Sequence, residues 1–527
     1  MNYAQLKEQI EHSWPGKAEC RFDAAQFTNE VICARTVLAE VCRRVFQEWD
    51  FSFAGLIVEE GASEWRLRYV FYGERETGWV HVLVSAPLAE NVFPSVVEWI
   101  HAADWHEREA EDMFGVHFEG HPRLGDFVLH DDAWQENVEP MRRSFDARRP
   151  PEDREAEPAW RPPTVVMAQG SFAMPVGPVF SDFAESAHFL LETVGEDVIR
   201  TIPRFFYKYR GVEKIAEGQP VDRVLLLAER FSGTAAFAHG LAFCQAVEAI
   251  GGIEVPPRGR ALRTVIAELE RLRHHAAAIA GICNSTALAV AASQAALIEE
   301  DLLRLSCEAV RHRYLFGVAM PGGVACDLTQ AQCRRLGDSV GEVALRLGKL
   351  HRMLRYSSSF LDRLEEVGVV SKEAALSYGL VGPIARASGV ARDLRKLRPY
   401  AAYDEVDFAV PLEAEGDGYA RLRILFAEAE QSAAIIRRRV SSLPAGPIHA
   451  SHAASRAGTA LAAVEAPSGA AFHWVRLSDD GTLARYRLTP PSFPNWHGFR
   501  LAAENFAFQD FPIILASFAL SNAECDR

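Results

Sequence analysis

The spacing of apolar residues predicts a strand-rich first part of the chain. Residues 53–58, 66–71 and 80–84 are short runs rich in valine, leucine and aromatic side chains, which favour β-strands. Over 36–49 the apolar residues recur at helical spacing, and a proline precedes a second, shorter helical pattern at 95–100. We therefore expect an α+β domain over residues 1–136.

Helical spacing dominates the later part of the chain. Two strand-like runs, 188–193 and 197–202, predict a β-hairpin. Long helical patterns then follow at 261–280, 294–314 and 330–357. The expected fold of residues 166–527 is a mainly α-helical domain with small β elements.

A charged, proline-rich stretch separates the two predicted domains. Residues 137–165 contain too few apolar side chains to fold alone, so they are interpreted as a linker. The most apolar stretch, 276–298, is interrupted by polar residues and predicts a buried helical segment, not a membrane span. Just before it, the polar stripe of Glu268, Arg271 and His275 is expected to join helices through ion pairs.

Composition and charge narrow the classes of function. The net charge of −15 argues against a surface for nucleic acid or for anionic lipid. The N-terminus lacks the pattern of a signal peptide, and the nine cysteines contain no Cys-x-x-Cys pair, which fits a reducing cytoplasm. No glycine-rich phosphate loop is present, so the chain is not expected to bind a nucleotide itself. Any membrane contact is expected only through partner subunits.

Small residues surround one histidine between Glu229 and His239. Serine, glycine and alanine side chains here allow close approach of another backbone or of a compact prosthetic group. An ordinary helix crossing with a hydrogen-bonded histidine explains the same pattern. The stretch resembles the Glu/Asp-Arg-x-Cys-Gly-x-Cys-x-x-x-His motif of nickel–iron hydrogenase large subunits. Ser232 and Ala235 occupy the two cysteine positions of that motif.

The C-terminal segment resembles the second metal motif of the same hydrogenases. Ser521 and Glu524 occupy its cysteine positions, and Cys525 lies one residue out of register. Nickel and iron in these enzymes need thiolate ligands, which hydroxyl, methyl and carboxylate groups do not replace. The sequence also ends where the maturing hydrogenase subunits continue. The resemblance therefore implies a degenerate site without metal.

Two further motifs resemble respiratory complex I. Residues 105–122, with an acidic helix expected to end at Gly115, resemble the C-type subunit of its peripheral arm. The loop 321–328 resembles a loop of its D-type subunit. The chain is thus similar to fused complex I C/D-type subunits and to the large subunits of hydrogenase-four and formate hydrogenlyase. A solvent-exposed helix with a simple cap is the alternative for 105–122.

The resemblance also indicates candidate site residues. Glu213 matches a glutamate that serves proton transfer in related hydrogenases, although an ion pair with a neighbouring basic residue is equally compatible. His239 is a second candidate for proton transfer. Phe180 and Phe231 are candidates for lining a quinone cavity, with core packing as the alternative. A mononuclear metal site would require His239, Glu524 and Cys525 to converge.

The resemblance implies an oxidoreductase subunit similar to NADH-quinone oxidoreductase, which is expected to be inactive as an isolated chain. Electron transfer, with a quinone as the candidate acceptor, would be coupled to proton or ion translocation without nickel–iron hydrogenase activity. The expected partners are a small subunit that holds an iron–sulfur cluster and antiporter-like membrane subunits. The expected location is peripheral, on the cytoplasmic face of the inner membrane. The alternative is a non-catalytic scaffold subunit of such a complex.

Overall fold

The structure, a computed structural model, describes residues 3–24, 26–73, 77–135, 137–149, 169–180, 185–450 and 456–527. The contacts divide the chain into two compact units. Unit 1 comprises Met1–Val165, Arg204–Ile215 and Leu376–Gly379. Unit 2 comprises Val166–Pro203, Ala216–Ala375 and Leu380–Arg527. Two short segments of the predicted helical domain thus pack with the N-terminal unit, and residues 150–165 of the predicted linker lie outside the described residues.

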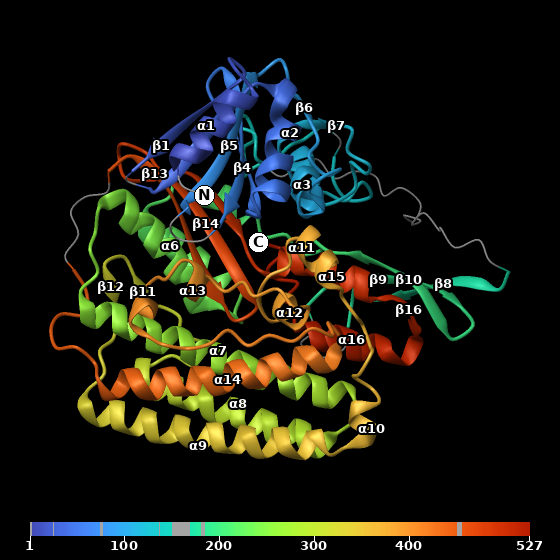
Figure 1. Cartoon of the computed structure of the whole chain (residues 1–527), viewed down its shortest axis with the longest axis vertical. Coiled ribbons are helices and arrows are strands. Elements are labelled where there is room, and N and C mark those ends of the chain that lie inside the picture. The colour runs from blue at the N-terminus through green and yellow to red at the C-terminus, as the bar shows by residue number, and fades with distance from the viewer. Residues whose placement is uncertain are drawn as a thin grey trace. The chain divides into compact units, whose positions relative to one another are not determined.

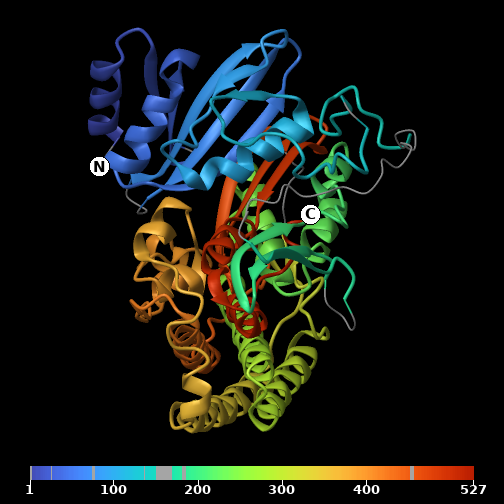
Figure 2. The same cartoon turned by 90° about the vertical axis from the view of Figure 1, so that its right-hand side faces the viewer.

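Unit 1 is built on a five-stranded sheet (Figure 1). Its order is β1-β2-β5-β4-β3, with β2 and β5 parallel and the other pairs antiparallel. The strands are β1 (Ala18–Asp23), β2 (Thr28–Cys33), β3 (Ser52–Glu60), β4 (Glu64–Tyr72) and β5 (Trp79–Pro87). Helix α1 (Tyr3–Ser13) lies next to β1, and α2 (Leu38–Arg43) lies next to β5 (Figure 2). The three predicted strands and the α+β character of this part are confirmed.

Helix α3 (Asp104–Phe114) forms the centre of the polar core of unit 1. It ends at Gly115, whose φ of 70° is the left-handed conformation that favours glycine. Its Glu107 is fully buried and accepts hydrogen bonds from the Tyr69 hydroxyl at 3.0 Å and the Ser95 hydroxyl at 2.6 Å. The alternative of a solvent-exposed helix is therefore wrong.

The helix predicted at 95–100 does not form. The segment makes turns, and its Val96 amide donates to the Glu107 carboxylate at 2.9 Å. The buried Glu107 carboxylate thus accepts a hydrogen bond from this backbone amide. In the first turn of a helix, such an amide would have to bond to water or to a capping side chain. This segment and α3 lie in the sequence between two short strands, β6 (Val92–Pro94) and β7 (His117–Glu119), which pair in parallel.

Unit 2 is organised around four long helices that lie side by side (Figure 1). They are α7 (Pro257–Ser285), α8 (Ala289–Val310), α9 (Gln330–Arg355) and α14 (Gly418–Ser441). The apolar stretch 276–298 forms the end of α7 and the start of α8, with a turn between them. In the described part of the chain, no helix is long and apolar enough to cross a membrane.

Small sheets and short helices complete unit 2. The sheet of β13 (Gly458–Ala466), β14 (Gly469–Leu477) and β15 (Leu483–Thr489) packs against α6 (Ala236–Gly251). A second sheet has the order β16-β10-β9-β8, with β8 (Ser171–Val176), β9 (His188–Val194), β10 (Asp197–Arg204) and β16 (Glu504–Ala507), and it contains the predicted hairpin. A third sheet is the antiparallel pair β11 (Ala319–Met320) and β12 (Gly323–Val324), and the loop 321–328 starts at the turn between these two strands.

The remaining short helices connect these elements. They are α4 (Val212–Ala216), α5 (Val221–Arg230), α10 (Ser358–Leu361), α11 (Lys372–Ser377), α12 (Gly382–Ala387), α13 (Leu394–Leu397), α15 (Ser492–Ala502) and α16 (Phe511–Phe518). The mainly helical character predicted for the later part of the chain is confirmed.

Candidate functional site

The structure brings together two residues that the sequence resemblance aligns with metal-binding cysteines of hydrogenases. Ser232 lies in the turn between α5 and α6, and Glu524 lies in the C-terminal segment after α16. The Ser232 hydroxyl donates to the Glu524 carboxylate at 3.3 Å, although the two residues are 292 positions apart. Both side chains are buried. Unit 2 therefore assembles this site from two motifs that lie far apart in the sequence.

A chain of hydrogen bonds leads from Glu524 into the interior. Nε2 of His239 lies 3.5 Å from the Glu524 carboxylate, and its Nδ1 lies 3.0 Å from Nε2 of His473. The Tyr486 hydroxyl is 2.7 Å from Nδ1 of His473. On the other side, the Ser232 hydroxyl is 3.0 Å from that of Thr234. We call this set the polar chain; its members in order are Thr234, Ser232, Glu524, His239, His473 and Tyr486.

Burial governs the charges of the polar chain. Burial raises the pKa of Glu524, but hydrogen bonds from His239 and Ser492 and the charge of His239 outweigh it, so the net shift is downward. Burial, together with the nearby His239, lowers the pKa of His473 well below its usual range. Glu524 is therefore ionised at neutral pH, while His473 is a neutral imidazole with one donor and one acceptor nitrogen.

The other two degenerate positions have different surroundings. Ser521 donates its hydroxyl to the carboxylate of Glu185, with oxygen–oxygen distances of 3.2 and 3.1 Å. The same carboxylate accepts from the Ala523 amide at 2.7 Å. Ala235 immediately precedes α6 and is buried. Sequence reasoning missed Glu185, because no motif surrounds it and only the fold places it beside the C-terminal segment.

Two buried carboxylates lie against the helix that carries His239, and one of them caps it. Glu270 of α7 accepts hydrogen bonds from the Phe237 and Ala238 amides at 2.8 and 2.9 Å, so it caps the first turn of α6. Glu229 accepts from the Gly317 amide. A Cβ at Gly240 would lie 3.0 Å from the Glu229 side chain, which explains the glycine one residue after His239.

The residues at the four degenerate positions do not fit a nickel–iron centre. They offer two hydroxyls, a methyl group and a carboxylate where the related enzymes use thiolates. Across the described residues, no group of three His, Cys, Asp or Glu side chains could hold a metal ion. The convergence of His239, Glu524 and Cys525 on one ion is therefore not found. Burial raises the pKa of the Cys525 thiol well above its usual range, which keeps it protonated.

The remaining predicted residues are dispersed. Phe231 is 3% exposed, and its ring centroid lies 4.6 Å from that of His239, so it packs against the polar chain. Phe180 is half-buried in the loop after β8. Glu213 is buried in α4, in the segment that belongs to unit 1. The structure thus gathers His239 and Phe231 with Ser232 and Glu524, and the roles of Phe180 and Glu213 stay predictions.

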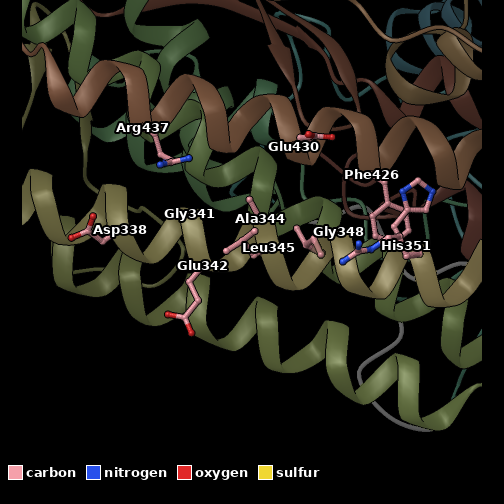
Figure 3. A pocket seen from close by; sticks show the side chains of 12 residues that line it. Asp338, Gly341, Glu342, Ala344, Leu345, Gly348, His351, Phe426, Glu430 and Arg437 are labelled. Carbon is pink, nitrogen blue, oxygen red and sulfur yellow. The ribbon is translucent and has the colours of Figure 1, made fainter.

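Two cavities of unit 2 lie outside the polar chain. A groove of about 730 Å³ runs between α9 and α14, where the His351 ring stacks on Phe426 at 4.3 Å (Figure 3). None of the predicted site residues lines it. A cavity of about 10 Å³, which has room for about one water molecule, is lined in part by His274, Arg421 and Ser468.

Comparison with known families matches both halves of the chain. Residues 31–151 match the family described as the respiratory-chain NADH dehydrogenase 30 Kd subunit. Residues 298–457 and 449–527 match the respiratory-chain NADH dehydrogenase 49 Kd subunit.

Individual relatives cover most of the chain. It is 29% identical to formate hydrogenlyase subunit 5 of Escherichia coli, over 85% of this chain and 79% of that protein. It is 29% identical to hydrogenase-4 component G of Escherichia coli, over 84% of this chain and 77% of that protein. It is 30% identical to the C/D subunit of NADH-quinone oxidoreductase from Bdellovibrio bacteriovorus, over 72% of this chain and 68% of that protein.

A solved structure of a respiratory membrane complex also contains a chain similar to this one. A chain of the membrane-bound sulfane sulfur reductase, an archaeal respiratory membrane complex, aligns with a TM-score of 0.64 and 27% identity. The alignment covers 69% of this chain and 100% of that one. With both domain types in one chain and relatives of the same kind along most of its length, this protein belongs to the complex I-related family of fused C/D-type subunits, together with the large subunits of hydrogenase-4 and formate hydrogenlyase.

Proposed function

We propose that the chain is a subunit of a membrane-associated respiratory oxidoreductase that couples electron transfer to proton or ion translocation without nickel–iron chemistry. Its relatives are subunits of complex I-like and hydrogenase-related complexes, which supports the general assignment. The observation that carries the specific proposal is the environment of Glu524. A carboxylate stands where the hydrogenases use a cysteine, and it is held by hydrogen bonds from Ser232, His239 and the Ser492 amide.

The proposed electron path runs through a partner. Among the described residues, the chain offers no metal-binding cluster, so electrons would come from an iron–sulfur cluster in a small partner subunit. A quinone is the proposed acceptor, with NADH the ultimate donor by analogy with the C/D-type relatives. Antiporter-like subunits would supply the membrane arm, with this chain on the cytoplasmic face. Glu213 and His239 are the proposed proton-transfer groups.

One observation favours a scaffold as the second candidate function. His239, His473, Tyr486 and Glu524 are each at most 1% exposed, and Phe231 packs over His239. Side chains therefore fill the space around His239 in unit 2. A subunit that only maintains the interface between electron-transferring and membrane subunits would show the same filling.

The metal and quinone content of the complex, purified from membranes through a tag on this chain, tests the proposal. We expect bound quinone, no stoichiometric nickel, and electron transfer to a quinone analogue. Nickel near one atom per complex would overturn the assignment of the degenerate site. Electron transfer that survives in Glu213→Gln and Glu524→Gln variants with full ion pumping would favour the scaffold.

A further inference from the structure

One face of α9, at the outer edge of the four-helix core, is exposed to solvent (Figure 1). Asp338, Leu345 and Arg352 follow one another at intervals of seven residues, or two helical turns, so their side chains share this face. All three are exposed, and Leu345 is 69% exposed. Glu342 and Lys349 are exposed beside them. Within two turns of Leu345, this face therefore has acidic side chains before that residue and basic side chains after it. We call these five residues the α9 stripe.

The charges of the α9 stripe are unpaired in the described part of the chain. Its four ionisable side chains form no ion pair with another described residue. By contrast, Arg346 on the side of α9 next to α8 pairs with Asp301 at 2.5 Å. Asp338 and Glu342 are like charges four residues apart, and both lie beyond the first turn of α9, where the helix dipole no longer favours acidic side chains. Helix stability alone therefore does not explain the placement of these two carboxylates.

The order of charges is complementary to itself when a second copy of α9 runs antiparallel. A two-fold axis beside Leu345, perpendicular to the helix, brings together residues that lie equally far before and after Leu345. Asp338, seven residues before it, then faces Arg352 of the second copy, and this pairing occurs twice. Leu345 faces its own copy and loses exposed apolar surface. Arg334 and the 90% exposed Tyr356, each eleven residues from Leu345, meet as a cation and an aromatic ring.

The two flanks of the α9 stripe fit the same arrangement, because such an axis keeps each flank on its own side. Towards α8, Glu342 is three residues before Leu345 and Lys349 is four residues after it, so the two meet at nearly the same level (Figure 3). Towards α14, Gly341 and Gly348 line the groove and leave room for two backbones to approach. A Cβ at Gly348 would meet nothing within 4 Å, so packing inside the chain does not explain this glycine in the middle of a helix.

We propose that the α9 stripe is an isologous docking surface for a second copy of this chain. Two kinds of ion pair, each formed twice, surround an apolar centre at Leu345. A partner segment of one charge sign would match only half of the stripe, whereas a second copy matches all of it. The inference goes beyond the proposed function and does not rest on it.

Sedimentation of the full purified chain over a range of concentrations tests the interface. We expect a monomer–dimer equilibrium in the wild type and a dissociation constant raised about tenfold or more in Asp338→Arg and in Arg352→Asp, because each change opposes like charges twice. A chain with both changes regains the attractive pairs, so its dissociation constant is expected to return towards the wild-type value. The control is Glu373→Arg, which reverses an exposed charge on α11 and is expected to leave the equilibrium unchanged.

Disulfide formation locates the contact. In a Cys307→Ser background, which removes the exposed native cysteine, Leu345→Cys is expected to form a covalent dimer in air. Only a two-fold contact at this residue brings both copies of it within bonding range. The control is Val290→Cys, at a 70% exposed position on α8. It lies about three turns from Asp301, whose partner Arg346 is next to the axis, so this variant is expected to form no covalent dimer.

Three results would overturn the proposal. The first is a wild-type chain that sediments as a monomer at every concentration, or a Leu345→Cys chain that gives no covalent dimer. The second is a dimer that both charge reversals leave unchanged, since it must use another surface. The third is loss of a different subunit from the complex, purified through a tag on this chain, in Asp338→Arg; that subunit would then occupy the stripe.

Discussion

At the scale of single residues, the main feature is that Ser232, Ser521 and Glu524 are held by hydrogen bonds to other side chains. A thiolate directs its lone pairs at a soft metal, whereas a buried carboxylate requires hydrogen-bond donors. Glu524 has three donors, in Ser232, His239 and the Ser492 amide. Ser521 instead donates to Glu185, a neighbour that only the fold provides. Ser232, Ser521 and Glu524 thus belong to a hydrogen-bonded polar cluster.

Replacement of Glu270 is expected to destabilise unit 2. Glu270→Ala leaves the buried Phe237 and Ala238 amides without their acceptor, which we expect to cost about 3 kcal/mol of unfolding free energy. Urea unfolding of the purified chain measures the change. The control is Glu299→Ala on α8, where a half-buried carboxylate lies 3.9 Å from Arg273. Equal stabilities of the two variants would refute the capping role.

At the scale of elements, α3 shows how a motif organises a domain. Its Asp112 accepts from the Val128 and Leu129 amides at 2.7 and 3.0 Å, and its Arg108 guanidinium lies 4.3 Å from the Phe127 ring centre. Together with Glu107, these side chains connect the helix to the loop after β7 and to the sheet. The motif at 105–122 therefore stabilises the conformation of unit 1.

Glu107 is expected to give the stability of unit 1 a pH dependence. Burial raises its pKa from 4.5 to about 7, so between these values the folded chain holds a proton that the unfolded chain has lost. Stability therefore falls as pH rises through this window, by about 3 kcal/mol in total. In Glu107→Gln we expect a smaller fall in Tm between pH 5 and pH 7. The exposed-face variant Glu64→Gln is expected to keep the wild-type slope, and equal slopes in all three chains would contradict the assignment.

The polar stripe on α7 joins several elements, as the sequence indicated. His275 contacts Glu428 of α14 at 2.9 Å, and Glu268 accepts from Arg395 of α13 at 3.0 Å. Arg271 donates to the Ala466 carbonyl at the end of β13. These charges are fully or almost fully buried, so each needs its partner.

Removal of Arg395 is expected to be strongly destabilising. Arg395→Ala leaves the carboxylates of Glu268 and Asp393 buried with one cation fewer, at an expected cost of about 3–5 kcal/mol. Thermal unfolding of the purified chain provides the measurement. Arg304→Ala, which breaks an exposed pair with Glu300 on α8, is expected to change Tm little. A small effect of Arg395→Ala would show that water replaces the lost donor.

At the scale of the whole molecule, one chain combines the two domain types that the family comparison identified. Unit 1 contains the α+β sheet with its α3 motif, and unit 2 contains the four-helix core and the polar chain. The relatives belong to respiratory membrane complexes, and in the described residues no helix of this chain is suited to cross a membrane.

Fractionation of cells tests how the chain reaches the membrane. We expect it in the membrane fraction and expect alkaline carbonate to release it without detergent, because protein contacts alone would hold it there. An antiporter-like partner subunit is the control that remains in the pellet. Retention of this chain after the wash would instead indicate a direct lipid attachment.

The two fold types and most of the long elements could be predicted without any structure. Periodicity reports which face of a segment is buried, so the strands β3 to β5 and the helices α7 to α9 were predictable. The placing of residues 232, 235, 521 and 524 at cysteine positions also comes from register within motifs, and it stays a prediction from the resemblance. Neither inference depends on contacts between distant segments.

The hydrogen-bond partners of Ser521 and His239 became visible only in the folded chain. Glu185, His473 and Tyr486 stand in no motif. Glu185 accepts from Ser521 and His473 contacts His239, each from far away in the sequence, and Tyr486 on the neighbouring strand contacts His473. The same holds for the missing helix at 95–100, where a carboxylate from α3 takes the Val96 amide. Hydrogen bonds between buried side chains depend on distances of a few tenths of an ångström, and the pattern of apolar residues along a chain does not encode such distances.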